Sequence, residues 1–555
     1  MMQKTQVRAP MLPLLLGLLT GLFLARHFDI SVYPLIGFAL IGSLITLLLA
    51  RFTSMHQLWM LGFLLSTTLC FWAYGQLRLP STPNKLNLEL PEREARLCIE
   101  VQTVTHSVDR YDKISGLARV LQAPENSRLN TGDRLHIHLP QKIKSDSTEK
   151  LIATIQQGIR IKVTGILTPI PDSPKENFNA YLKNIGVHYR LARTCNVQIV
   201  RPPTQFSQFR ANMNRHFQKV LKLGTPANQP ELANIYVTML LGCKAELTET
   251  QSNRYRMTGT MHFFAISGLH IGVIATVIAN CLHLMRVPRF LGPLIGIPLL
   301  YLYVEITGGS SSAVRAFSMI AFFWSSFAFN RQHTSFSALI NSAIFVLAIN
   351  PDQLWNLGFQ LSYTVVGSIL LLGLPLHQIL KTRFEPYRWL PENSWKLRHR
   401  ISTWMLDKFF QLFAISFSAW LASAPFCAVL FDFISPGTIV LNMLLVYLVA
   451  IVIISGIVSL TCSFIQILFL SEFINHSAWF AIYVMDRVVI FGTTLPNLNL
   501  SDKCFPPNLI YGILILYFVI LLWLHYYPGK IATGYVALPI ILILSGLSIG
   551  FWVYG

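Results

Sequence analysis

Residues 258–273, TGTMHFFAISGLHIGV, place several groups capable of proton transfer or anion binding inside an otherwise apolar segment. His262, Ser267, Gly268 and His270 lie within about three helical turns of one another. Polar and ionisable groups are costly in hydrocarbon, so in a membrane helix they usually face a bundle interior or an aqueous path. The segment therefore predicts a water-accessible path lined by these four residues.

Two other functions could explain the polar residues of this segment: hydrolysis and proton transfer. Ser267 and His270 share a helix face, as a hydrolase would need, but no nearby acid could orient the histidine and Ser267 is not in a strand-turn-helix elbow. We therefore expect no catalytic residue and no enzyme. A proton relay through Glu305 and His270 is the stronger rival, because intramembrane pairs of this kind mark ion pathways.

Metal and nucleotide chemistry lack their usual signatures. The eight cysteines form no C-x-x-C pair, and His136-x-His138 is not followed by the Asp-His of a metal site, so two exposed histidines are expected. Gly529-Lys530 lacks the earlier glycine and the following hydroxyl residue of a phosphate-binding loop. The sequence predicts no metal, no cofactor, no nuclease activity and no ATPase activity.

The elements that must position these residues are membrane helices. Hydrophobic residues make up 53% of the chain, charged residues 12%, and the mean hydropathy is +0.50. About 20 apolar residues cross a bilayer, and the apolar runs do not alternate with polar residues as barrel strands would. We predict spans near 11–26, 33–50, 57–77, 262–284, 289–306, 312–329, 335–349, 359–375, 409–431, 437–456, 457–470, 476–494, 508–527 and 533–554.

Charge predicts the orientation of these spans. The formal net charge is +19, and the segment 377–408 holds seven lysines and arginines against three acids. The positive-inside rule places this segment in the cytoplasm, together with Arg286, Arg289 and Arg331. Orientation, lipid headgroups and DNA are all open explanations for its charge. Three spans would then deliver residue 80 to the outside.

A polar segment, 91–202, separates the first spans from the rest. Its short alternating runs predict five or six strands, near 97–104, 117–121, 134–139, 159–166, 187–192 and 196–200. An OB-like barrel is the best specific interpretation. Such barrels often bind single strands through basic grooves and stacked aromatic rings. The candidate stacking rings are Tyr111, Phe178, Tyr181 and Tyr189, and packing in the barrel core is the alternative role for them.

Two cysteines bracket the same segment. Cys98 and Cys195 could form a disulfide or stay free thiols in two strands.

An amphipathic helix is expected next, from Phe206 to Leu223. Its apolar stripe is flanked by cations and no acid, which is typical of a helix at the membrane interface. Lipid is the simpler partner for it. On the outer side, the cations Arg210, Arg215 and Lys219 are candidate DNA contacts.

Several ordered motifs resemble the ComEC family of competence channels. Besides 258–273, the family's pattern resembles 240–244 (LLGCK, with Cys243 where an acid is frequent), 308–316 (GGSSSAVRA), 350–363 (NPDQLWNLGFQLSY) and 417–446. The resemblance extends from the first spans to about residue 460. Many ComEC proteins end in a metallo-β-lactamase-like domain, whose H-x-H-x-D-H signature is absent here.

The resemblance implies a multi-pass protein of the bacterial inner membrane that admits single-stranded DNA to the cytoplasm. Its helices would come from residues 1–80 and 258–555, flanking an OB-like extracytoplasmic domain (91–202) and amphipathic interfacial helices (203–257). Matching path residues are His262, Ser267, Gly268, His270, Gly308, Gly309, Arg315, Gly358, Gln360 and Ser362. Implied partners are single-stranded DNA, membrane lipids, a separate ATPase or cytoplasmic strand-binding protein, a periplasmic DNA receptor and nuclease, and a second copy of the chain. A proton-coupled small-solute transporter and a non-transporting scaffold are the alternatives.

Overall fold

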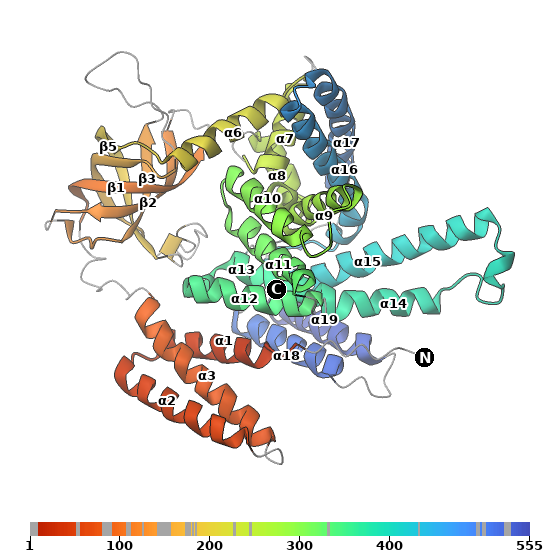
Figure 1. The fold of residues 1–555 in the computed structure, drawn as a ribbon, viewed down its shortest axis with the longest axis horizontal. Coiled ribbons are helices and arrows are strands. Elements are labelled where there is room, and N and C mark those ends of the chain that lie inside the picture. Colours follow the sequence, from red (N-terminus) through yellow and green to blue (C-terminus); the bar gives the residue numbers. More distant parts are fainter. Residues whose placement is uncertain are drawn as a thin grey trace.

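Helices dominate the structure, and one small barrel stands beside them (Figure 1). The computed structural model describes residues 9–51, 56–79, 91–106, 113–124, 127–140, 157–171, 179, 182–183, 186–225, 229–243, 247–329, 334–430, 433–494, 500–501, 507–526 and 534–554. The predicted combination of many apolar helices with one inserted β domain is confirmed.

Three helices precede the barrel: α1 (Leu12–His27), α2 (Val32–Leu49) and α3 (His56–Arg78). Gly17 and Gly21 let α1 and α3 approach closely, since a Cβ on Gly17 would lie 2.2 Å from the Thr67 hydroxyl oxygen. A Cβ on Gly21 would lie 2.6 Å from the Thr68 carbonyl oxygen. The G-x-x-x-G pattern here therefore serves helix packing.

Five strands close the barrel: β1 (Arg93–His106), β2 (Lys113–Gln122), β3 (Arg134–Pro140), β4 (Arg160–Pro169) and β5 (Val187–Arg201). Their order is β1-β2-β3-β5-β4, antiparallel except for the parallel β3–β5 pair, as expected for an OB-like barrel. The two strands predicted at 187–192 and 196–200 are one strand. Arg193 and Asn196 adopt positive φ, and register shifts beside them bend β5 without ending it.

The barrel has its own core. Leu135, Ile137 and Leu139 of β3 point inward and are at most 1% exposed, and the cluster they join consists of barrel residues alone. The alternation seen in the sequence is thus the alternation of the two strand faces.

The barrel decides between the two alternatives for Cys98 and Cys195. Both are free thiols, on β1 and β5, with β4 between them. Two strand spacings are about 10 Å, beyond the reach of a disulfide. The expectation that His136 is exposed is wrong, since only 6% of its surface is accessible. Burial, aided by His138 and Arg190, lowers the pKa of His136 to about 4.

Helices then follow to the end of the described chain. Their bounds are α6 (Gln205–Leu221), α7 (Pro230–Leu241), α8 (Glu249–Met257), the 3-10 turn η4 (Met261–Phe264), α9 (Gly268–Leu284), α10 (Gly292–Ile306), α11 (Ser311–Ala328), α12 (Ser335–Ile349), the 3-10 turn η5 (Pro351–Trp355), α13 (Leu357–Ser368), the π-turn η6 (Ile369–Gly373), α14 (Leu374–Arg383), the 3-10 turn η7 (Glu392–Ser394), α15 (Leu397–Leu430), α16 (Thr438–Phe464), α17 (Leu468–Thr494), α18 (Pro507–Tyr526) and α19 (Gly534–Tyr554). The short strands β6 (Phe433–Ile434) and β7 (Leu500–Ser501) pair with each other.

Most predicted spans correspond to these helices, with one clear error. No separate span lies at 457–470, because that range holds the end of α16, a turn with Gln466 at positive φ, and the start of α17. Among the described residues, five helices are long and apolar enough to cross a membrane: 32–49, 57–78, 357–383, 397–430 and 438–464. The apolar helices within 12–27, 268–284, 292–306, 335–349, 511–526 and 536–548 are shorter.

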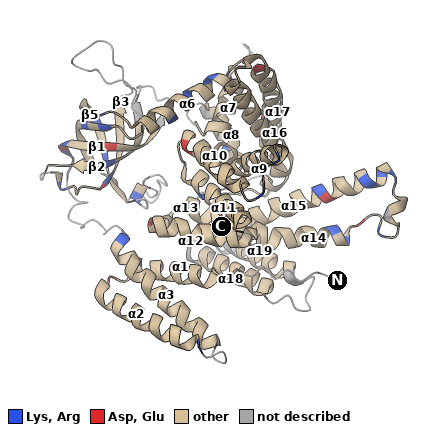
Figure 2. Cartoon of the chain, viewed as in Figure 1, with Lys and Arg blue, Asp and Glu red and all other residues tan. Residues whose placement is uncertain are grey.

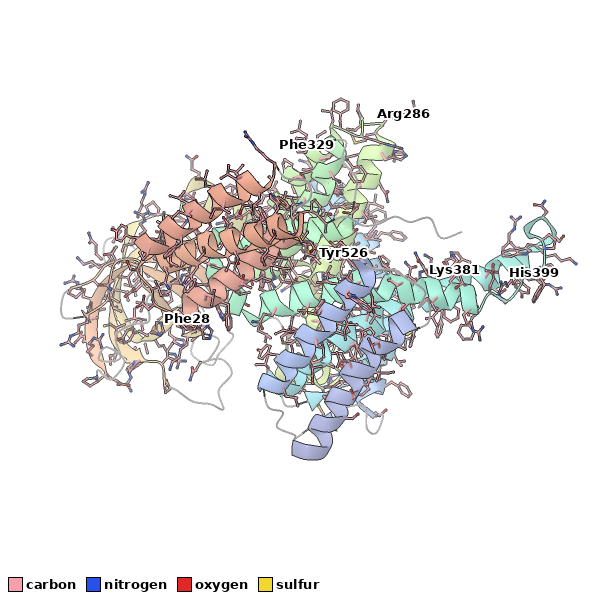
Figure 3. The ribbon with its side chains drawn as sticks, turned by 90° about the horizontal axis from the view of Figure 1, so that it is seen from below. Phe28, Arg286, Phe329, Lys381, His399 and Tyr526 are labelled. Carbon is pink, nitrogen blue, oxygen red and sulfur yellow. The ribbon has the colours of Figure 1, made fainter. Side chains whose placement is uncertain are left out.

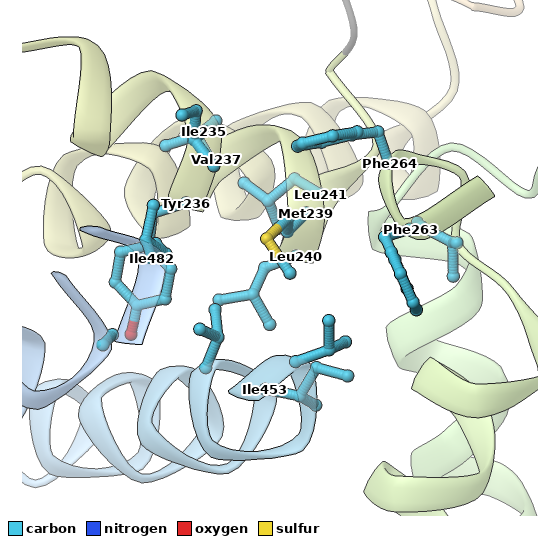
Figure 4. Packing of buried hydrophobic residues seen from close by; sticks show 14 of the residues in the cluster. Ile235, Tyr236, Val237, Met239, Leu240, Leu241, Phe263, Phe264, Ile453 and Ile482 are labelled. Atoms are coloured by element: carbon cyan, nitrogen blue, oxygen red, sulfur yellow. The ribbon is translucent and has the colours of Figure 1, made fainter. Parts of the chain in front are cut away.

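The largest core surrounds α7 (Figure 4). Every α7 side chain from 232 to 241 is buried except the half-buried Asn234, and the helix packs against η4, α16 and α17. The expectation that 203–257 forms interfacial helices is therefore wrong for α7. A helix that is apolar on nearly all sides is a buried helix.

Candidate functional site

The polar segment 258–273 folds as a broken helix. Gly259 turns the chain after α8 with φ +68°, η4 follows, and Ser267 begins α9. Phe263 and Phe264 are 2% and 0% exposed, so both rings belong to the core. The His262 side chain is exposed instead, with its Nδ1 3.0 Å from the Gly259 carbonyl oxygen. The break thus turns one polar group outward while burying its two neighbours.

His270 has a structural role that the sequence analysis missed. It is the third residue of α9 and forms a capping box with Ser267: Nδ1 lies 3.4 Å from the Ser267 amide nitrogen and 3.0 Å from its hydroxyl. Such a reciprocal cap satisfies the first amides of a helix. The ring is fully buried, and its Nε2 has no hydrogen-bond partner among the described residues. One ring nitrogen therefore caps the helix, and the other is left for a further partner.

Gly308 and Gly309 separate α10 from α11. Their φ angles are +94° and +59°, a region that side chains other than glycine rarely adopt. A Cβ on Gly308 would meet no atom within 4 Å, and one on Gly309 only the Glu305 carboxylate at 3.9 Å. Close packing therefore does not explain these glycines, unlike Gly17 and Gly21. They break the helix beside open space.

Arg315 lies one turn further along α11 and is 3% exposed. Its Nη2 would be 3.1 Å from a Cβ on Gly358, at the start of α13. Asn356 caps that helix by accepting a hydrogen bond from the Gly358 amide at 2.8 Å. A guanidinium beside the positive end of a helix creates a local potential that favours an anion.

Gln360 and Ser362 lie on the same helix with different surroundings. Gln360 donates from Nε2 to the Leu354 carbonyl oxygen at 3.0 Å, so it fastens α13 to the preceding turn η5. Ser362 is half-buried. Gly268, by contrast, has no atom within 4 Å of the position of a Cβ, so its place at the start of α9 is open.

The three DNA-contact candidates of α6 differ from one another. Arg210 forms an ion pair with Glu305 of α10, with side chains 13% and 18% exposed, so its cation already has a partner in this structure and its DNA contact stays a prediction. Arg215 and Lys219 are exposed, and Arg215 donates within α6 to Asn212 at 2.7 Å. Tyr111, Phe178 and Tyr181 lie outside the described residues. Tyr189 is 5% exposed and belongs to the barrel core.

The Arg210–Glu305 pair also bears on the relay from Glu305 to His270. Glu305 is held by α6, and Asn214 of the same helix donates to the Ile306 carbonyl oxygen at 2.8 Å. α6 is therefore fastened to the last turn of α10, directly before the glycine break. It packs on protein as well as carrying an exposed cationic face.

The helices that carry these residues form one assembly. α11 contacts α9, α10, α12 and α13. It therefore brings His270, the glycine break and the Arg315–Gly358 contact into neighbouring helices. Among the described residues, no group of three histidines, cysteines or acids could hold a metal ion.

Sequence reasoning missed two sets of polar contacts in this assembly, one buried and one partly buried. Asn475 of α17 is fully buried and donates to the Val220 carbonyl oxygen at 2.9 Å. Asp486 accepts a hydrogen bond from the Tyr255 hydroxyl at 3.2 Å and lies 3.7 Å from Arg254. The available signal was the presence of acids in an apolar helix, Glu472 and Asp486 of α17, since such groups need partners.

Fold and site together define a helical protein with candidate membrane spans, an inserted barrel and a broken-helix centre. The family model described as "Competence protein" matches residues 239–527, just over half of the chain. The chain therefore belongs to the competence protein family, and the predicted ComEC-type membership is confirmed.

Individual relatives agree with this assignment. The chain is 23% identical over 279 residues to "ComE operon protein 3" of Bacillus subtilis, covering 49% of this chain and 34% of the relative. It is 25% identical over 222 residues to "Recombination protein 2" of Haemophilus influenzae, covering 39% and 26%. An uncharacterized protein of Aquifex aeolicus is 28% identical over 116 residues, covering 21% and 27%. The matches thus span about a third of these relatives or less, and no solved structure matches the chain.

Proposed function

We propose that this protein is a channel in the bacterial inner membrane that passes single-stranded DNA to the cytoplasm during natural transformation. Its membership in the competence family supports a role in DNA uptake. The observation that carries the finer proposal is the break at Gly308–Gly309. Irregular backbone at membrane depth is tolerated where it lines a cavity, and this one faces open space.

The charge pattern around the break suits an anionic cargo. A nucleic-acid strand carries one negative charge per nucleotide and needs a lined aqueous path through hydrocarbon. The start of α11 after the glycines offers donors to passing phosphates. The Arg315 guanidinium beside the start of α13 and the Nε2 of His270 are buried here, so in the proposed channel they would reach a phosphate only when the surrounding helices open. Gly268 adds an open position at the start of α9, and His262 adds an exposed one before the break.

The two rivals fit less well. A proton-coupled transporter would use Glu305 with His270, but Glu305 is paired with Arg210. A scaffold without transport would not need glycines that face open space between α10 and α11. We also propose that the chain is no enzyme, so strand cutting and pulling belong to partners.

Those partners follow from the energetics. Moving a negative charge inward against a potential costs about 2.3 kcal/mol per 100 mV. A separate ATPase or a cytoplasmic strand-binding protein would supply this energy, after a periplasmic receptor and nuclease have delivered one strand. A second copy of the chain and the surrounding lipids complete the proposed set.

The test follows labelled DNA in cells lacking the gene. We expect labelled single-stranded DNA to be lost from the cytoplasm while the amount of DNA taken up into the periplasm stays normal. A normal amount of labelled strand in the cytoplasm would refute the channel. Topology is tested on the exposed thiol of Cys195, with the other cysteines replaced. Labelling of Cys195 from outside is expected. Labelling only from the cytoplasm would overturn the orientation and the path with it.

The absence of enzymatic activity is tested on the purified chain. It is incubated with labelled single-stranded and duplex DNA and divalent metals, and phosphate release from ATP is measured in parallel. Neither cutting nor hydrolysis is expected. Metal-dependent cutting that survives further purification and is lost in His136→Ala would show that the histidine pair does chemistry of its own.

A further inference from the structure

A basic hairpin projects from the helical body at residues 377–408. It consists of the end of α14, the connection through η7 and the first turns of α15 (Figure 1). The lysines and arginines that the sequence assigns to a loop lie along this projection, as Figure 2 shows. Figure 3 shows Lys381 and His399 on it, away from Arg286 and Phe329.

The hairpin is an ordered element. Asp407 of α15 accepts from Lys381 Nζ at 3.0 Å and from His377 Nε2 at 3.1 Å, both on α14. Nearer the tip, the Tyr387 ring lies 4.5 Å from the His399 ring and 6.2 Å from that of Trp395. The Lys381–Asp407 ion pair and the His377–Asp407 hydrogen bond at the base, together with tilted and edge-on ring contacts near the tip, therefore hold its two arms together.

The hairpin is long enough to extend past a bilayer that α15 crosses. Residues 409–430 of α15 are about 33 Å long, which already matches the ~30 Å hydrocarbon core. Residues 397–408 add about 18 Å, whereas the headgroup layer is only about 5–8 Å thick on each side. With residues 409–430 in the hydrocarbon and α15 along the membrane normal, Trp404 would lie at headgroup depth, where tryptophan is favoured. The tip, from Phe384 to Leu397, would then extend beyond the headgroups into water.

The tip exposes both cations and rings. Arg383, Arg388, Lys396, Arg398 and Arg400 are all exposed. Trp389 is 93% exposed and Phe384 56%. A lipid surface does not account for rings at this distance, and a topogenic signal needs no rings at all. Basic side chains interleaved with exposed rings are the pattern that holds single strands, by phosphate contact and base stacking.

We propose that this basic hairpin binds single-stranded DNA on the cytoplasmic side, as the receiving surface for a strand leaving the helices. The inference rests on the proposed function for the side and the cargo. Arg388 and Arg398 contact phosphates, and Trp389 stacks on a base. Capture here would hinder return of the strand through the membrane.

The binding test uses the full chain in nanodiscs of neutral lipid with a fluorescent oligothymidine of about 30 nucleotides, long enough for several phosphate contacts and stacked bases. Arg388→Gln with Arg398→Gln removes two phosphate contacts, so the slope of log K against log salt should become shallower by about 1.4. Trp389→Ala should weaken binding about 5- to 150-fold, the range for one stacked base. Arg286→Gln with Arg289→Gln is the matched control, since it removes two exposed cations elsewhere on the predicted cytoplasmic side.

Photo-crosslinking separates the hairpin from other strand contacts. A photoreactive residue in place of Phe384 should crosslink the strand, and one in place of Phe329, which is 75% exposed, should not. Unchanged affinity and slope, or equal crosslinking at both positions, would overturn the inference. So would hairpin variants that lose binding to anionic vesicles or to an acidic protein but keep the strand.

Failure of this inference is distinguishable from failure of the channel. If the hairpin variants bind the strand like wild type while deletion of the gene still blocks cytoplasmic uptake, only the inference fails. If the hairpin binds strand but deletion leaves uptake normal, the channel proposal fails.

Discussion

Cutting the Arg210–Glu305 ion pair should loosen α6 from α10 and destabilise the helical assembly. The pair joins residues 95 positions apart in sequence and is largely shielded from water. Arg210→Met removes the cation, keeps much of the side-chain volume, and leaves the Glu305 carboxylate without its partner. Burying a charge without a partner is what makes the loss costly.

The size of the effect follows from the burial. Losing one partner of a fully buried pair costs about 3–5 kcal/mol, and an exposed pair contributes at most about 1 kcal/mol. With side chains 13% and 18% exposed, we expect about 2–3 kcal/mol for Arg210→Met, discounting the buried value for partial solvation. Adding Glu305→Gln neutralises the remaining acid and should recover part of this loss.

The assay compares thermal unfolding of the wild type, both single variants and the double variant in one detergent. The expected order places the double variant above Arg210→Met. Arg215→Met is the control, because Arg215 is exposed and its hydrogen bonds to other described residues lie within α6. This substitution should change stability by less than about 0.5 kcal/mol. A double variant no more stable than the less stable single variant would refute the shielded-pair argument.

Three further predictions test the barrel and the site. Burial lowers the pKa of His136 from its ordinary value of 6.5 to about 4, so the unfolded state binds the proton first as pH falls. The barrel should therefore lose up to about 3 kcal/mol of stability between pH 6.5 and pH 4. In urea unfolding of the isolated barrel, His136→Gln should flatten this loss, and an unchanged pH profile in the variant would count against the argument. Gly358→Ala should destabilise the protein by about 1 kcal/mol, because overpacking against Arg315 outweighs the gain in helix propensity. Gly268→Ala should not destabilise it, because a Cβ there would lie in open space. Equal melting temperatures for the two variants would contradict the Arg315–Gly358 contact. His270→Gln should keep the capping box and normal abundance of the protein in the membrane, but it should impair uptake of the strand into the cytoplasm. His270→Ala should lower both the abundance and the uptake. Full uptake with His270→Gln would show that His270 serves only as a helix cap.

Local pattern was enough to predict much of the fold. The barrel strands follow from the two-residue alternation of inward and outward side chains, as in 134–139. The long apolar runs predict helices because hydrocarbon requires internally satisfied backbone groups. Errors arose where local signals are weak: a bulge kept β5 in one piece, and one turn near Gln466 separates α16 from α17.

The candidate site was only partly predictable for the same reason. Glycines at 308 and 309 and a charge at Arg315 stand out in an apolar chain, so the sequence by itself determined which positions are unusual. Their partners depend on which helices meet. Only the tertiary structure pairs Arg210 with Glu305 and brings Arg315 onto Gly358, because side chains from distant helices become neighbours through packing that no local period encodes.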